Sequence, residues 1–255
     1  MALASEKATA LVLRVVQFSE TSSIVTLFTR EFGKLRAIAK GARRPKGPFE
    51  SALDLLALCR IVFRPKSSDA LDLLTEAKLE RRFRPFERDL ASLYAGYYVA
   101  ELLIELTDQH DPHPPLFDLA DGVLADLSRG GPVASLVLRF ELVALRILGH
   151  LPSLDRCVVC GTAVEDRPRV AFGQWEGGVL CHGCRIGKRH VVLVSADVMR
   201  AIRDHAGAGD AWRQAQTPLA ETGELRAVMN HYLSHLVGHP LRLHRCLATL
   251  AGNRP

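Results

Sequence analysis

Short stretches of alternating apolar and polar residues fill the beginning of the chain and predict β-strands. They occupy residues 8–18, 23–30, 34–40, 53–63 and 70–78, with turn-forming residues between them. Because successive side chains of a strand point to opposite faces, this period of two is typical of half-buried strands. Five strands over about 75 residues match the size of a small barrel such as the five-stranded oligonucleotide/oligosaccharide-binding (OB) fold.

The hydrophobic period changes to about 3.6 after Arg81, which predicts packed helices. Apolar residues recur at helical spacing near residues 90–101, 136–147 and 225–236. Ser195 is a predicted N-cap for a helix over residues 196–205, and the prolines at 112–115 should interrupt the helical region. We therefore expect an α+β multidomain protein, with a barrel over residues 1–80 and an α-helical domain over residues 81–255.

Four cysteines inside the helical domain have the spacing of a zinc ribbon. Cys157, Cys160, Cys181 and Cys184 form the pattern C-x2-C-x20-C-x2-C, so the segment 155–190 is predicted as an inserted ribbon that binds one Zn²⁺. Four protein ligands leave no open coordination position, so this zinc should be structural. A redox role is disfavoured because neither pair lies in a βαβ context.

Composition places the chain among globular proteins, with 48% hydrophobic and 24% charged residues. The start of the chain has charges at Glu6 and Lys7, where a signal peptide would be apolar. The most apolar later stretch contains Arg139, Glu141 and Arg146, so we expect no membrane span and a cytoplasmic location.

The net charge of +5 is unevenly distributed. Residues 30–46 contain seven cations and one acid, and in a strand Lys34, Arg36 and Lys40 would share one face. Arg14 would join this surface if its strand is a neighbour. A solvated charged face is the alternative, but so large an excess of one sign favours a polyanion such as nucleic acid. Phe18, Phe28 and Phe32 are candidates for base stacking or for the core.

The sequence contains no phosphate-binding loop, nucleophile elbow or HExxH pair, so we expect no enzymatic activity. A second metal site at His231, His235 and His239 would require their helix to continue, whereas Pro240 should end it. No cysteine or acid is placed to complete such a site.

Several of these segments resemble the RecO family of bacterial DNA repair proteins. The resemblance covers residues 8–14, 20–21, 27–31, 33–34 and 39–46, the helical domain, and residues 156–161 with Cys181 and Cys184. It implies an N-terminal OB fold, a helical domain and an embedded zinc ribbon. By position, it also implies DNA-contact candidates at Arg14, Lys34, Arg36, Lys40, Arg43, Arg44 and Lys46.

The activity implied by the resemblance is that of a recombination mediator associated with the nucleoid. Such a protein binds single- and double-stranded DNA, anneals complementary strands, and works with RecR, alongside RecF, to load RecA onto DNA coated by single-strand-binding protein. A zinc-ribbon transcription or translation factor and a metal-dependent nuclease remain as alternatives.

Overall fold

The computed structural model describes residues 4–44, 47, 49, 52–66, 70–165, 167–214, 219–244 and 246. The chain divides into two compact units, Met1–Val133 and Ala134–Pro255, and each is described by itself.

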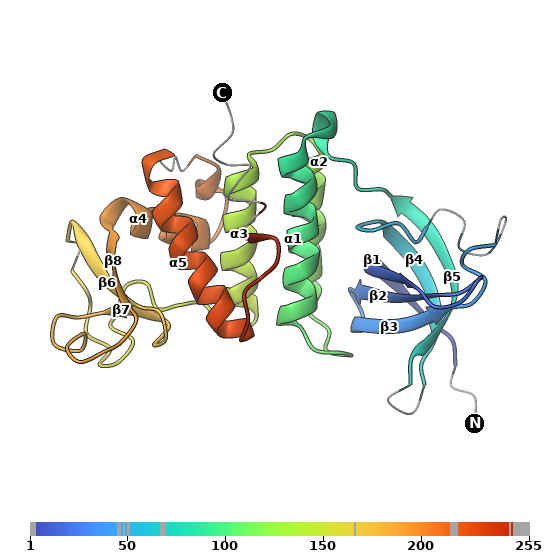
Figure 1. Cartoon of the computed structure of the whole chain (residues 1–255), viewed down its shortest axis with the longest axis horizontal. Coiled ribbons are helices and arrows are strands. Elements are labelled where there is room, and N and C mark those ends of the chain that lie inside the picture. Colours follow the sequence, from blue (N-terminus) through green and yellow to red (C-terminus); the bar gives the residue numbers. More distant parts are fainter. Residues whose placement is uncertain are drawn as a thin grey trace. The chain divides into compact units, whose positions relative to one another are not determined.

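A closed five-stranded barrel forms the first part of the N-terminal unit (Figure 1). Its strands lie in the order β1-β2-β3-β5-β4, and β4 pairs back with β1. Every pairing is antiparallel except the short parallel contact between β3 and β5. The predicted OB-type barrel is confirmed; its strands are β1 (Glu6–Gln17), β2 (Ser23–Thr29), β3 (Gly33–Ala39), β4 (Leu58–Arg64) and β5 (Asp72–Arg81).

Alternate residues of each strand fill the barrel interior. Val12, Val25, Leu27, Leu35 and Phe63 belong to one buried cluster, with other side chains of the same strands pointing outward. The predicted strand over residues 53–63 was wrong at its start, because β4 begins at residue 58. The preceding residues form a turn, in which the Ala57 amide donates to the Asp54 carbonyl at 3.1 Å and Leu56 has φ of 63°.

Two helices of the same unit, α1 (Leu90–Leu106) and α2 (Pro114–Ser128), pack beside the barrel (Figure 1). Asp89 caps α1 by accepting from the Ser92 amide at 2.9 Å, and two prolines occupy the first turn of α2, where no amide donor is needed. Phe28 of β2 lies against Phe117 of α2, with ring centroids 6.1 Å apart. Part of the outer barrel surface is therefore helix-covered and buried.

The loop between α1 and α2 lies against the first half of β3. Only Ala37, Ile38 and Ala39 of β3 pair with β5, and the loop occupies the adjoining stretch, where the His110 amide donates to the Lys34 carbonyl at 3.0 Å. Gly33 permits this approach, since a Cβ there would lie 2.1 Å from the Asp111 carbonyl oxygen. Residues far apart in sequence thus complete the edge of the barrel.

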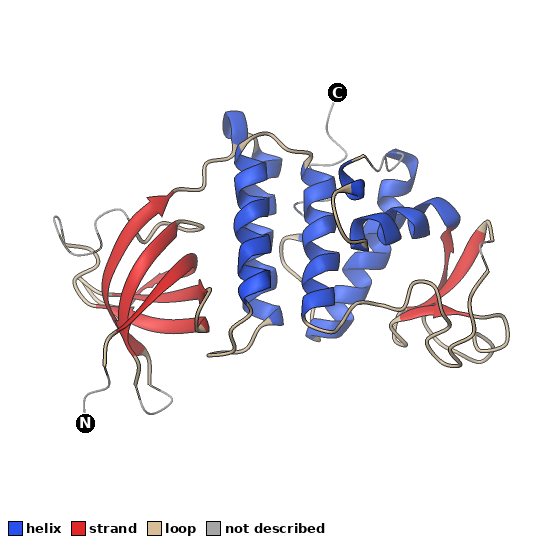
Figure 2. Ribbon diagram, turned by 180° about the vertical axis from the view of Figure 1, so that it is seen from behind, coloured by secondary structure: helices blue, strands red, loops and turns tan. Residues whose placement is uncertain are grey.

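Within its described residues, the C-terminal unit combines three α-helices with a small sheet (Figure 2). Ser195 caps α4 through a hydrogen bond from the Val198 amide, as predicted. The sheet has the order β7-β6-β8, and β6 and β7 form an antiparallel hairpin between the cysteine pairs. The elements are α3 (Val133–Ile147), β6 (Arg169–Gly173), β7 (Gly178–Leu180), β8 (Val191–Ser195), α4 (Ala196–Ala206) and α5 (Leu219–Val237).

Glu141 and Arg226 form a buried ion pair in this unit. Both guanidinium η nitrogens of Arg226 on α5 donate to the Glu141 carboxylate on α3, at 2.9 and 2.6 Å. Glu141 is fully buried. A buried carboxylate requires such a partner, because removing a charge from water costs several kcal/mol.

Candidate nucleic-acid interface and metal centre

Strand register organises the outward side chains of β1, β2 and β3 into rows. Residues that pair directly in antiparallel strands point to the same side of the sheet, and the next row on that side is two residues away. The three rows are Leu11–Phe28–Lys34, Arg14–Thr26–Arg36 and Val16–Ile24–Ile38. A bulge between Val12 and Arg14 shifts the register of β1, so that Arg14 points outward although Val12 points inward.

The helices cover the first row. Leu11 and Phe28 are fully buried, and the Lys34 ammonium donates to the carbonyl oxygens of Ile104 and Thr107 at the C-terminal end of α1. Burial lowers the pKa of Lys34. Lys34 therefore neutralises the negative end of a helix, and its charge is turned away from solvent.

The second and third rows are open to solvent and combine basic with apolar side chains. Arg14 and Arg36 are exposed, and they flank Thr26 across β2. Val16 is 43% exposed in the next row. We call the set Arg14, Val16, Ile24, Thr26, Arg36 and Ile38 the barrel face.

The loop that follows β3 extends this surface with further cations. Lys40, Arg43 and Arg44 are exposed. The Arg43 amide donates to the Thr21 carbonyl at 3.1 Å, which ties the loop to the β1–β2 turn beside Phe18. Lys46, the remaining predicted DNA contact, lies outside the described residues.

The three phenylalanines considered for base stacking differ in exposure. Phe18 is 61% exposed beside the barrel face. Phe28 is buried against α2, and Phe32 packs edge-on against Phe63 of the barrel core. Of the three, Phe18 is therefore the one whose ring can reach a base.

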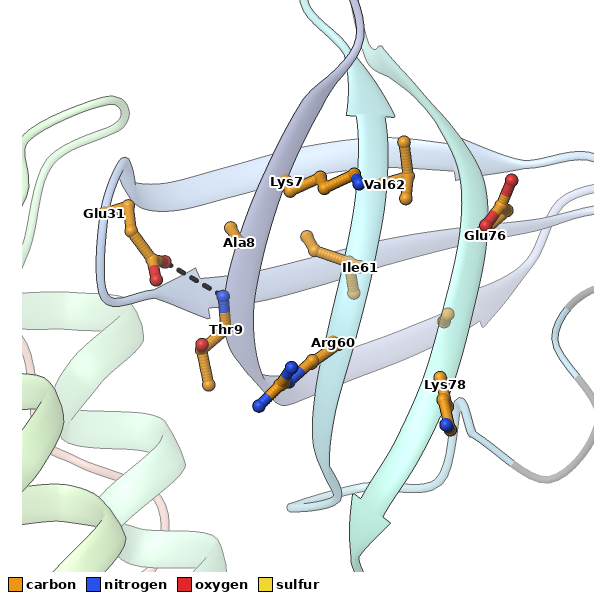
Figure 3. A pocket seen from close by; sticks show the side chains of 10 residues that line it. Lys7, Ala8, Thr9, Glu31, Arg60, Ile61, Val62, Glu76 and Lys78 are labelled. Atoms are coloured by element: carbon orange, nitrogen blue, oxygen red, sulfur yellow. Dashed lines mark hydrogen bonds between the residues drawn. The ribbon is translucent and has the colours of Figure 1, made fainter.

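The outer surface of β1, β4 and β5 has a different charge balance (Figure 3). A hollow of about 600 Å³ is lined there by Lys7, Arg60 and Lys78, but also by Glu31 and Glu76. Mixed signs give this surface little net attraction for a polyanion. Its lysines and arginine serve as matched controls for those of the barrel face.

The four predicted metal-ligating cysteines come together in the C-terminal unit. The sulfur atoms of Cys157, Cys160, Cys181 and Cys184 all lie within 4.8 Å of one another. Those of Cys160 and Cys181 are 3.7 Å apart, close to the spacing of about 3.8 Å that zinc–sulfur bonds of 2.3 Å give in a tetrahedron.

Two turns and the hairpin position these sulfurs. In the first turn the Gly161 amide donates to the Cys157 carbonyl at 2.8 Å, and Gly161 has a φ of 73°. The Val158 amide donates to the Val179 carbonyl of β7 at 3.0 Å, which fixes this turn to the sheet. Preformed geometry of this kind favours a resident metal ion over four free thiols.

Local hydrogen bonding favours the thiolate form at Cys157 and opposes it at Cys184. Burial opposes ionisation of Cys157, but backbone amides of Cys181, Cys160 and Val159 bring its pKa down to about 6. Hydrogen bonds with the Cys181 and Cys160 thiols, together with burial, raise the pKa of Cys184 to about 12. A divalent cation would stabilise the deprotonated sulfur of each ligand, so the donor set fits a Zn²⁺ ion.

The histidines singled out in the sequence do not form a second metal site. Among the described residues, the four cysteines are the one group arranged to hold a metal ion. α5 ends at Val237, so His239 does not continue the helical face of His231 and His235. Within the described part of the chain, no helix is long and apolar enough to cross a membrane.

Sequence reasoning missed the contact of Lys34 with the end of α1 and the exposed Val16 of the barrel face, whereas it had named Phe18 as a stacking candidate. The alternation in residues 34–40 identified the outward side of β3 but not which part of it the helices cover. The contact between Gly33 and the loop at Asp111 was not readable from the sequence.

Comparison with known proteins gives matches over nearly the whole chain. Residues 1–83 match the family model described as Recombination protein O N terminal, and residues 87–245 match Recombination protein O C terminal. The chain is 50% identical to the DNA repair protein RecO of Rhodopirellula baltica over 198 residues, covering 77% of this chain and 73% of the relative. It is 36% identical to that of Anaeromyxobacter sp. (strain K) over 243 residues, covering 94% and 95%.

Proposed function

Since the chain belongs to the RecO family of DNA repair proteins, we propose that it binds DNA through the barrel face and the basic loop that follows it. The observation that carries this proposal is the open pair of rows in which Arg14 and Arg36 flank Thr26. Lys40, Arg43 and Arg44 add positive charge at the end of the same strands.

The chemistry of this surface fits phosphate contacts rather than base reading. Arginine donates to phosphate in a bidentate manner, and exposed Val16 and Phe18 offer apolar contact to sugars and bases. Such a surface would accept both single- and double-stranded DNA with little sequence preference.

Annealing of complementary strands follows from the same charge. A cationic surface lowers the repulsion between two phosphate backbones and raises the local concentration of both strands. No nucleotide is consumed in this mechanism. We further propose that the protein acts in the cytoplasm with RecR, and alongside RecF, to assist loading of RecA onto DNA coated by single-strand-binding protein.

The cysteine cluster would hold one structural Zn²⁺. When bound, the ion joins two turns that contain few buried apolar residues and thereby stabilises the surrounding fold. All four coordination positions would be filled by sulfur, which leaves none for a substrate. We also retain a barrel domain over residues 1–80 and a helical domain over residues 81–255, interrupted at 155–190, as the proposed division of the chain.

The test is salt-titrated binding of a fluorescent oligonucleotide, in single- and double-stranded form, with and without RecR. Arg14 and Arg36 of the barrel face and Lys40, Arg43 and Arg44 of the basic loop are five exposed cations. If each neutralises one phosphate, log affinity should fall with log salt at a slope of about −3.5 for single strands and −4.5 for duplex. A triple variant with Arg14, Arg36 and Lys40 replaced by alanine should lose about 2 from the single-strand slope and should anneal strands more slowly.

A second triple variant, with Lys7, Arg60 and Lys78 replaced by alanine, is the matched control. It removes the same charge from the other outer surface of the barrel and should keep the wild-type slope. Equal losses in both variants would contradict the proposed interface. A strong dependence on oligonucleotide sequence would favour a transcription or translation factor, and cleavage with Mg²⁺ would favour a nuclease.

A further inference from the structure

The turn between β6 and β7 presents an exposed tryptophan in a stack of aromatic rings. Trp175 is 50% exposed, and its ring lies on that of His190, with centroids 3.8 Å apart and planes inclined by 24°. His190 precedes β8. Because tryptophan is highly buried on average, a half-exposed indole stacked on other rings is a candidate binding surface.

Two histidines of α5 extend this arrangement. The His235 ring lies 6.2 Å from that of Trp175, with planes inclined by 18°, and the His231 ring lies 6.3 Å from that of His190, with planes inclined by 22°. Four nearly parallel rings therefore come from three segments of the chain. We call Trp175, His190, His231 and His235 the ring cluster.

The backbone holds the ring cluster in place. His190 has a φ of 55°, a left-handed conformation that is unfavourable for a non-glycine residue. Its carbonyl accepts a hydrogen bond from the Gln174 amide at 3.0 Å, which ties it to the Trp175 turn. The rings are thus preorganised, which lowers the entropy lost when a ligand stacks on them.

The segment that leads to His190 is positively charged. The segment 182–190 contains Arg185, Lys188 and Arg189 and no acid. Lys188 pairs with Glu176 at 3.3 Å, and among the described residues no carboxylate pairs with Arg185 or Arg189. Both arginines are exposed beside Ile186, which is 72% exposed.

We propose that the ring cluster, with Arg185 and Arg189, binds single-stranded nucleic acid by stacking a base on Trp175 and pairing the arginines with phosphates. Aromatic platforms beside cations are the recurring solution for single strands, because every base has a stacking face. A duplex hides those faces, so this site prefers single strands. It shares no residue with the barrel face, so its test does not depend on that proposal.

Tryptophan fluorescence tests this site directly in the full-length, zinc-loaded protein. The chain has two tryptophans, and the second, Trp212, is buried, so the variant Trp212→Phe leaves Trp175 as the reporter. An oligothymidylate should quench this fluorescence, whereas an abasic oligonucleotide of equal length should not. Both are measured on the background with Arg14, Arg36 and Lys40 replaced by alanine.

Affinity measurements complete the test. On the same background Trp175→Ala should weaken oligothymidylate binding roughly five- to 150-fold, from the range known for base–aromatic stacking. Trp175→Phe should restore most of it, which excludes misfolding as the cause of the loss. Leu193→Ala, at another exposed apolar residue of this unit, is the control and should bind like its parent.

Three results would overturn the proposal. Equal quenching by the abasic strand would mean phosphate binding without stacking. Quenching by an acidic peptide but not by oligothymidylate would make the surface a protein-docking site. An unchanged affinity in Trp175→Ala would remove the ring from binding. Failure of the proposed DNA binding by the barrel face would be seen in a different measurement. The variant with Arg14, Arg36 and Lys40 replaced by alanine would then keep the wild-type salt slope.

Discussion

Lys34 and Arg36 stand two residues apart on the same side of β3, and the structure predicts opposite consequences of neutralising them. Arg36 is exposed in the open rows of the barrel face. The Lys34 ammonium instead donates to the carbonyls of Ile104 and Thr107. We therefore expect Arg36→Gln to weaken DNA binding with little effect on stability, and Lys34→Met to lower stability with little effect on DNA binding.

The magnitudes follow from these contacts. A hydrogen bond from a charged group contributes about 1.5–3 kcal/mol, and a cation at a helix C-terminus contributes about 0.3–1 kcal/mol more. Lys34→Met should thus lower the free energy of unfolding by about 2–4 kcal/mol. Arg36→Gln removes one phosphate contact, which should reduce the single-strand salt slope by about 0.7.

Two assays separate the outcomes. Urea unfolding followed by circular dichroism gives the stability of each variant, and fluorescence anisotropy between about 50 and 200 mM NaCl gives the salt slope. Lys34→Arg, which keeps the charge, should retain more stability than Lys34→Met. The reasoning is refuted if Lys34→Met reduces the salt slope as much as Arg36→Gln while unfolding like the wild type.

Three further predictions concern the C-terminal unit. Chelation of the metal, or Cys160→Ser, should lower the thermal stability of the C-terminal unit, measured by differential scanning fluorimetry. The salt slope of DNA binding, measured by anisotropy, should stay the same. An unchanged melting profile would contradict a structural metal. Glu141→Ala should cost about 3–5 kcal/mol in urea unfolding because it leaves Arg226 buried without its carboxylate; a cost below 1 kcal/mol would contradict this role. Burial lowers the pKa of His244 to about 4, below an unfolded value near 6.5. The contribution of the neutral imidazole to stability is therefore complete above pH 6.5 and declines by about 3 kcal/mol towards pH 4. His244→Gln should flatten the pH dependence of the unfolding free energy between pH 6.5 and 4, and an unchanged pH dependence would refute the assignment.

Local sequence patterns predicted the elements whose causes are local. The period of two placed the barrel strands, the paired cysteines indicated the metal-binding turns, and Ser195 marked the start of α4. These features depend on residues within a few positions of one another, or on a spacing with one common structural solution. They could therefore be read without knowledge of the tertiary fold.

Long-range packing determined what the patterns could not. Nothing near Phe28 in the sequence reveals that Phe117 covers it, and nothing near Lys34 reveals the helix carbonyls that it contacts. The alternation therefore identified an outward side of β3 and predicted that it is exposed along the whole strand. In the structure, α1 and α2 cover one end of that side. The ring cluster was likewise hidden, because its members are drawn from residues 175, 190, 231 and 235.

The loop of residues 107–113 limits how this protein can be divided or recombined with its relatives. Gly33 has no side chain and so leaves room for the backbone of Asp111, and the loop completes the edge of β3. The strands and the loop must therefore change together. A chimaera joined immediately after β5 would pair one parent's edge with the other's loop and would fold poorly. A junction placed beyond α2 would keep the matched surfaces from one parent and should give the more stable hybrid.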